Sequence, residues 1–123
     1  MFNGTCWKNY PEQIVGSGTV FDLDVDHNNN IWAGTTNGVS RFDGNNWTIY
    51  KISRYAGDIM VDQNNNIWAI TPGKGVYMFD GTNWKTYTEK EGLVSDFVLS
   101  LAVDQNNHVW LGTEEGVSKY TPV

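Results

Sequence analysis

Two aspartates at matching places in an internal repeat, Asp22 and Asp58, are the side chains of this 123-residue chain best placed for acid chemistry. Both lie near the start of segments that alternate apolar and polar residues, as half-buried β-strands do. Carboxylates gathered around one axis could hold a cation, bind a polyol or serve a metal-dependent hydrolase of small molecules. They could also be solvated acids or partners of Arg and Lys. We favour the second interpretation, because the repeat offers too few other metal ligands.

A second set of oxygen ligands comes from three copies of the pattern Asp-x-Asn-Asn-(Asn/His)-(Ile/Val)-Trp, which begin at Asp26, Asp62 and Asp104. The start of the pattern resembles a calcium loop, which also needs Gly at its sixth position and a bidentate Glu at its twelfth. No copy has the Gly, and only the third has the Glu, Glu115. We therefore predict structural turns, with no metal site and no cofactor.

Other catalytic arrangements find little support. His27 and His108 occupy non-equivalent turn positions, and no third His or Cys accompanies them at the spacing of zinc ligands. The single cysteine, Cys6, cannot form an intrachain disulfide. Neither a Ser-His-Asp or Cys-His arrangement nor a glycine-rich phosphate loop can be argued from the sequence. The sequence predicts that the protein is not an enzyme.

The charge balance restricts the partners. Fourteen Asp and Glu residues against eight Lys and Arg residues give a formal net charge of −6. Nucleic acids and anionic membranes are bound through basic surfaces, so neither is an expected partner. The given chain shows neither a signal peptide nor an apolar run of the roughly 18 residues that cross a membrane, and we expect a soluble domain. A cleaved signal peptide would leave the same sequence, so the compartment stays open.

The Asn-rich turns recur roughly every 40 residues, a period typical of arrays of supersecondary units. Each unit holds short segments rich in β-branched and aromatic residues, separated by Gly, Asn and Asp, which indicates strands and hairpins. Four antiparallel strands, A to D, in such a unit are a β-propeller blade. We predict an all-β propeller with repeats over residues 19–50, 56–88 and 97–121. Asp43-Gly44 and Asp80-Gly81 predict type I′ turns between strands C and D.

The third repeat has no strand D, whereas residues 2–10 align with strand D of the other repeats. The order is therefore D-ABCD-ABCD-ABC within a single domain, residues 1–123. Propeller rings have about four to eight blades, so three cannot close a ring. Two chains would give six blades, and we expect a homodimer in which the N-terminal strand of each chain completes the last blade of the other. The alternative is a fragment of a longer propeller.

The segments Asp-x-Asn-Asn-Asn-Ile-Trp-x-Gly-Thr, Gly-Val-x-(Arg/Lys)-aromatic-Asp-Gly and Trp-x-x-Tyr are together similar to the two-component regulator propeller repeat. Residues 87–98 resemble the linker between blades in that family. The resemblance covers nearly the whole chain and implies a β-propeller. Because the family's repeats form extracytoplasmic sensor propellers of hybrid histidine kinases, often tied to polysaccharide sensing, it also implies a sensor-like role in the periplasm or outside the cell.

Function is expected on the face where the D–A and B–C loops gather, because these loops vary most between the repeats. The candidate ligand-binding residues are Arg54, Tyr55, Lys74 and Asp96 on that face, with Asp22 and Asp58 near the axis. The Trp residues recur in every repeat and are expected to fill the space between blades, although a sugar could also stack on them. We predict a noncatalytic module that binds a carbohydrate or a protein. The alternatives are a purely structural piece of a larger sensor and the hydrolase described above.

Overall fold

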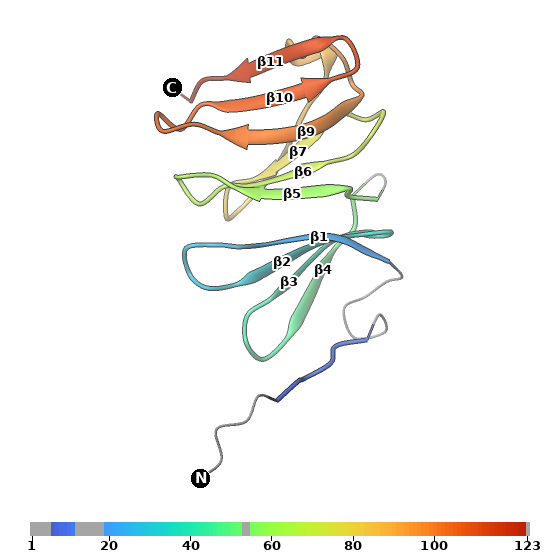
Figure 1. The fold of residues 1–123 in the computed structure, drawn as a ribbon, viewed down its shortest axis with the longest axis vertical. Coiled ribbons are helices and arrows are strands. Elements are labelled where there is room, and N and C mark those ends of the chain that lie inside the picture. The colour runs from blue at the N-terminus through green and yellow to red at the C-terminus, as the bar shows by residue number, and fades with distance from the viewer. Residues whose placement is uncertain (1–5, 12–18, 53–54, 123) are drawn as a thin grey trace.

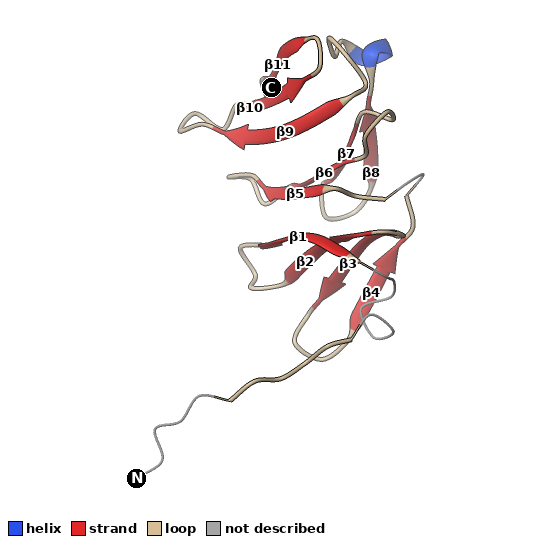
Figure 2. Ribbon diagram, turned by 45° about the vertical axis from the view of Figure 1, so that its right-hand side comes forward, coloured by secondary structure: helices blue, strands red, loops and turns tan. Residues whose placement is uncertain are grey.

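Three antiparallel sheets, stacked face to face, make up the computed structural model, which describes residues 6–11, 19–52 and 55–122 (Figure 1). The first sheet contains β1 (Val20–Val25), β2 (Ile31–Thr35), β3 (Gly38–Phe42) and β4 (Trp47–Tyr50). The second contains β5 (Asp58–Val61), β6 (Ile67–Ile70), β7 (Val76–Phe79) and β8 (Trp84–Tyr87). The third contains β9 (Val98–Val103), β10 (Val109–Thr113) and β11 (Gly116–Tyr120). A 3₁₀ helix, η1 (Glu89–Glu91), lies between β8 and β9 (Figure 2).

The strands of each sheet follow one another in chain order, so β1, β5 and β9 each form one edge of their sheet. The sheets lie within the predicted repeats 19–50, 56–88 and 97–121. Among the helical segments of the described ranges, none has the length and apolar character needed to cross a membrane.

The hairpin between the first two strands of each sheet contains one asparagine in the left-handed conformation. These residues are Asn29, Asn65 and Asn107, with φ of 66°, 65° and 61°. Asn adopts this conformation at lower cost than most residues with a Cβ atom. The three Asn runs therefore form turns, as the sequence predicts.

The type I′ turns predicted at Asp43-Gly44 and Asp80-Gly81 are wrong. The loops span residues 43–46 and 80–83, and only the glycine of each pair has a positive φ, whereas type I′ needs two such residues. The reason is the aspartate side chain. Oδ1 of Asp43 accepts hydrogen bonds from the backbone N–H of Asn45 and Asn46, which stabilises a longer loop.

Two hydrophobic seams join the sheets. The first, between the β1–β4 and β5–β8 sheets, buries Trp32, Val39, Ala56, Ile59, Ile67, Ala69 and Phe79. The second, between the β5–β8 and β9–β11 sheets, buries Trp68, Ile70, Val76, Met78, Val98, Val109 and Leu111. The middle sheet therefore buries both of its faces, as a blade inside a propeller does.

Each seam contains a Trp–Tyr stack within one sheet. The ring centroids of Trp32 and Tyr50 are 5.7 Å apart, and those of Trp68 and Tyr87 are 5.8 Å apart. Both indoles are fully buried. The aromatic residues that recur in each repeat thus supply much of the apolar area between blades.

The outer faces of the first and third sheets are open. On the first sheet Leu23 is 57% exposed, and on the third Trp110 is 41% and Val117 is 63% exposed. Exposed apolar residues gathered on a sheet face usually mark an interaction surface.

Residues 6–11, called the N-terminal segment below, lie beside the first sheet (Figure 1). Of the strand predicted over residues 2–10, residues 2–5 lie outside the described residues. Residues 6–11 pair with none of the described strands. The ring of Tyr10 nevertheless packs on Phe42 and Trp47, with centroid distances of 5.1 and 5.9 Å.

Candidate functional site

The aspartate that opens each Asn-rich turn holds the whole turn together. Oδ1 of Asp62 accepts hydrogen bonds from the backbone N–H of Asn64 and Asn66, and Oδ2 accepts from Nδ2 of Asn66 and from Nε1 of Trp68. Asp26 makes the corresponding four bonds in the first sheet. Each carboxylate thereby fixes the turn and the orientation of the following indole, a structural role.

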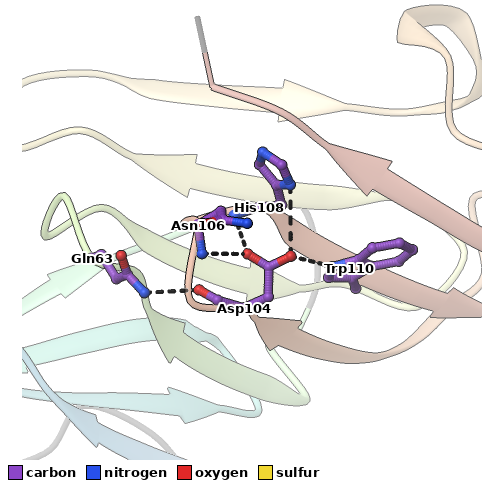
Figure 3. Close-up of polar contacts among 5 residues, drawn as sticks. All are labelled: Gln63, Asp104, Asn106, His108 and Trp110. Carbon is purple, nitrogen blue, oxygen red and sulfur yellow. Dashed lines mark hydrogen bonds and ion pairs between the residues drawn. The ribbon is translucent and has the colours of Figure 1, made fainter.

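The third turn has the same design with one change (Figure 3). Asp104 accepts from the backbone N–H of Asn106 and His108 and from Nε1 of Trp110, while Nδ1 of His108 lies 3.6 Å from Oδ2 of Asp104. The hydrogen bond from the Trp110 indole lowers the pKa of Asp104 below its ordinary value. In the described residues no group of three or more His, Cys, Asp and Glu could hold a metal ion.

The left-handed asparagines link neighbouring sheets. Oδ1 of Asn65 accepts from the backbone N–H of His27, at 2.8 Å, and Oδ1 of Asn107 accepts from the backbone N–H of Gln63, at 2.9 Å. Nε2 of Gln63 also donates to the carbonyl oxygen of Asp104, at 2.8 Å (Figure 3). The Asn runs therefore connect blades as well as close hairpins.

Asp22 and Asp58, which the sequence predicts near the axis of a closed propeller, lie close together on β1 and β5, the edge strands of two neighbouring sheets. Oδ2 of Asp22 accepts from the backbone N–H of Ile59, and Oδ2 of Asp24 accepts in the same way from Val61. The side chains of Asp22 and Asp58 also hydrogen-bond to each other. Both β1 carboxylates thus satisfy backbone groups at the exposed edge of β5.

The two acids of this pair titrate differently. Burial, followed by the hydrogen bond and the charge of Asp22, raises the pKa of Asp58 to about 7. For Asp22, burial alone would raise the pKa, but hydrogen bonds from Asp58 and from the backbone of Ile59 lower it below its ordinary value. The pair therefore shares one proton at pH values below about 7.

The shared proton predicts a pH dependence of stability. Because the pKa of Asp58 is higher in the folded state than in the unfolded chain, the free energy of unfolding should fall as pH rises from about 4 to about 7. We expect a loss of about 1 kcal/mol, discounted for solvent screening of this partly exposed group. Asp58→Asn keeps a hydrogen-bond donor toward Asp22 and should remove the slope in urea unfolding measured between pH 5 and 8.

The control for this measurement is Glu115→Gln, which neutralises an exposed carboxyl away from the pair. It should retain the slope of the unaltered protein. An Asp58→Asn protein that still loses stability between pH 5 and 8 would show that another group carries the dependence.

On the loop face, Lys74 and Asp96 line one groove of about 490 Å³, formed by the β6–β7 loop and the connection from β8 to β9. Its lining residues are Gly73, Lys74, Thr86, Thr88, Glu89, Lys90, Glu91 and Asp96. Tyr55 lies elsewhere, with its ring 5.4 Å from that of Phe21 on β1. Arg54 lies outside the described residues. Of the four predicted loop residues, the structure therefore brings two together.

Side chains of the β8–β9 connection hold the groove in shape. Thr88 and Glu91 form a capping box around η1, in which Oε1 of Glu91 accepts from the backbone N–H of Thr88, at 2.7 Å. Oδ1 of Asp96 accepts from the backbone N–H of Glu89, and Oε2 of Glu89 accepts from the backbone N–H of Asp96. Asp96, predicted as a ligand-binding residue, thus also fastens the loop, while the side chain of Lys74 is exposed.

The sequence interpretation missed two features: the bond from each Trp to its Asp, and the links between sheets made by asparagine side chains. A signal for the first was present, since Asp and Trp are separated by the same interval in all three copies. A buried indole N–H usually finds an acceptor, and a carboxylate recurs six residues before the Trp in every copy.

Comparison with known proteins supports the same architecture. The profile of the two-component regulator propeller family matches residues 92–115. Among proteins of curated function, none matches the sequence. Several solved structures are similar over most of this chain, among them the following three.

The first is PorZ, described as an essential bacterial surface component of the type-IX secretion system of Porphyromonas gingivalis, with 24% identity and a TM-score of 0.69 over 83% of this chain and 17% of PorZ. The others are extracellular domains of two putative hybrid two-component systems of B. thetaiotaomicron. BT3049 has 23% identity and a TM-score of 0.70, over 82% of this chain and 15% of its own. BT4673 has 20% identity and a TM-score of 0.69, over 87% of this chain and 16% of its own.

The chain thus spans about a sixth of the length of each of these structures. At these identities the likeness bears on the fold alone, and the family profile adds the repeat type. The β-propeller fold and the resemblance to the two-component regulator propeller repeat, both predicted from the sequence, are confirmed.

Proposed function

We propose that this chain is a noncatalytic recognition module, which closes into a six-bladed ring with a second copy and binds its ligand on the loop face. The observation that carries this proposal is the groove of about 490 Å³ beside Lys74 and Asp96. Its walls come from the β6–β7 loop, the end of β8 and the β8–β9 connection, and seven of its eight lining residues have polar or charged side chains. A set of donors and acceptors of this kind suits the hydroxyls of a carbohydrate or the polar groups of a peptide.

The β8–β9 connection is held in one conformation by its own hydrogen bonds, which supports ligand binding in the groove. Hydrogen bonds within residues 88–96 fix the backbone around the groove before a ligand arrives. A pre-organised site loses less conformational entropy on binding than a flexible one. The side chains of Lys74 and Lys90 are exposed and available to a polar ligand.

The use of the axial acids favours a noncatalytic role. Asp22 and Asp24 accept backbone hydrogen bonds from β5, which commits one oxygen of each to structure. The alternative, a metal-dependent hydrolase of small molecules, rests on the Asp22–Asp58 pair and requires a stoichiometric metal in the purified protein. Elemental analysis without metal would argue against it.

An extracytoplasmic location is part of the proposal. Two of the similar structures are extracellular domains of putative hybrid two-component systems, and the matched family profile is that of regulator propellers. A carbohydrate or protein ligand outside the cytoplasm would fit a sensor-like role. The competing interpretation is a purely structural piece of a larger sensor, with no ligand of its own.

Binding to an oligosaccharide array tests the proposal, with Lys74→Ala as the groove variant. The side chain of Lys74 is exposed and only its backbone N–H bonds to the fold, so the variant should fold normally. We expect at least a tenfold loss of affinity for any bound glycan, because a charged donor is removed from the groove.

Lys85→Ala is the matched control, since Lys85 is also exposed but is not among the residues that line the groove; it alternates on β8 with Thr86, which does line it. It should bind as the unaltered protein does. Two results would count against recognition at this groove: an array without any binding, or equal binding by the two variants.

A further inference from the structure

The exposed faces of the first and third sheets carry residues equivalent to those on the two sides of a buried seam inside the chain. In the first buried seam, Ile59 and Ile67 of the second sheet cover the first sheet. In the repeat, Leu23 and Ile31 are the corresponding residues of the first sheet, and Leu23 is 57% exposed whereas Ile59 is 4% exposed. A further blade on this face would bury Leu23 as Ile59 is buried now.

The N-terminal segment already occupies part of the position of that blade. In the first seam, Tyr50 of β4 packs on Phe79 and Trp84 of the next sheet, with centroid distances of 5.4 and 5.6 Å. Tyr10 makes the corresponding contacts with Phe42 and Trp47, at 5.1 and 5.9 Å. Tyr10 thus lies on the first sheet as the fourth strand of a preceding blade would.

Among the described residues, no other strand of such a blade lies beside Tyr10, and an apolar groove occupies its position. The groove has a volume of about 440 Å³ between the N-terminal segment and the face of the first sheet. Its lining residues are Trp7, Lys8, Asn9, Tyr10, Val20, Leu23, Ile31, Ala33, Phe42 and Trp47.

Within the described ranges, the third sheet lacks the aromatic partner that the tryptophans of the other two sheets have. Trp32 and Trp68 each stack on a tyrosine from the fourth strand of their own sheet, but no fourth strand pairs with β11 among the described residues. Its tryptophan, Trp110, is 41% exposed. Nζ of Lys119 lies over the Trp110 ring at 5.4 Å, as the guanidinium of Arg41 lies over Trp32 at 5.8 Å. One face of the Trp110 ring is therefore held by Lys119, and the ring is exposed enough to stack on a tyrosine.

The Asn-rich turns also leave one donor and one acceptor, at opposite ends of the chain's three sheets, for a contact with another blade. Asn65 and Asn107 accept hydrogen bonds from the backbone of His27 and Gln63 in the preceding sheets. The next pair in this series is Asn29, on the first sheet, and Gln105, on the third. Both residues are exposed.

We propose that a second copy of this chain docks its β9–β11 sheet on the open face of β1–β4, where the N-terminal segment of the first copy completes it. This proposal depends on the six-bladed ring of the proposed function and names the residues in the contact between the two copies. Trp110 of the second copy stacks on Tyr10 of the first. The backbone N–H of Gln105 of the second copy donates to Oδ1 of Asn29 of the first. Both halves are present in one chain, so the contact is head-to-tail, and two such contacts close a six-bladed ring under a two-fold axis.

A disulfide experiment tests the seam in the full chain, with Cys6→Ser as the background. Asn29→Cys and Gln105→Cys are introduced together, and the protein is mildly oxidised. A covalent species of about 28 kDa, twice the 13.9 kDa of one chain, is expected on a non-reducing gel. Mixing the two single variants should give the same species, whereas each single variant alone should stay at the mass of one chain.

The matched control is His27→Cys with Asn65→Cys, which places cysteines at the equivalent contact inside one chain. It should close an intramolecular disulfide and stay at 13.9 kDa. If this control closes while the Asn29/Gln105 pair remains monomeric, the seam is wrong. A ladder of longer species without a dimer would overturn closure by two copies. Loss of glycan binding in a cross-linked dimer would affect only the proposed recognition role.

Discussion

Replacing Asp62 with alanine is expected to lower the free energy of unfolding by about 3 to 4 kcal/mol. The carboxylate is 2% exposed and accepts four hydrogen bonds, two from backbone N–H groups and two from the side chains of Asn66 and Trp68. Alanine would leave the buried indole N–H of Trp68 without its acceptor and would remove the acceptor of three part-buried donors. Urea unfolding followed by tryptophan fluorescence measures the change.

Asp104→Ala is the matched comparison, because Asp104 holds the same kind of turn in the third sheet. Asp104 and its indole partner are much more exposed, so water can take over the lost hydrogen bonds. A smaller loss of stability is expected. If the two variants were equally destabilised, burial of the Asp62 site would not explain its importance.

The Asn-rich turns show how far the sequence could be interpreted. Asn tolerates a positive φ, and this local property was enough to predict the turns at Asn29, Asn65 and Asn107. The same asparagines also accept hydrogen bonds from neighbouring sheets, which depends on how two blades lie against each other. Because strand patterns specify a sheet and not the offset between sheets, this second role needed the three-dimensional structure.

The candidate site residues could likewise be placed from the sequence, but their contacts could not. Asp22 and Asp58 could be placed near the axis because they recur in the repeat, yet their bond to each other and the bond of Asp22 to Ile59 depend on the contact between sheets. Lys74 and Asp96 belong to loops that do not repeat. The sequence could place these loops on one face, but not predict that Asp96 would bond reciprocally with Glu89.

The second large effect is expected for Trp68→Ala, which should lower the free energy of unfolding by about 4 kcal/mol. The indole is 1% exposed and stacks on the ring of Tyr87. Its ring centroid lies 5.0 Å from that of Tyr120, and its Nε1–H donates a hydrogen bond to Asp62. Its removal leaves a large cavity in the second seam and takes away one of the two hydrogen bonds that Oδ2 of Asp62 accepts. Urea unfolding measures the loss.

Trp110→Ala separates folding from assembly. The residue has the same position in its repeat but is 41% exposed in one chain, so its removal should destabilise the isolated chain less than Trp68→Ala does. In the proposed ring it loses the stack on Tyr10 of the other copy, and light scattering should then give 13.9 kDa in place of about 28 kDa. A Trp110→Ala protein that still assembles fully would mean that this tryptophan does not lie in the contact between copies. A stable monomer would show that the same residue type that holds the blades together inside the chain also joins one chain to the next.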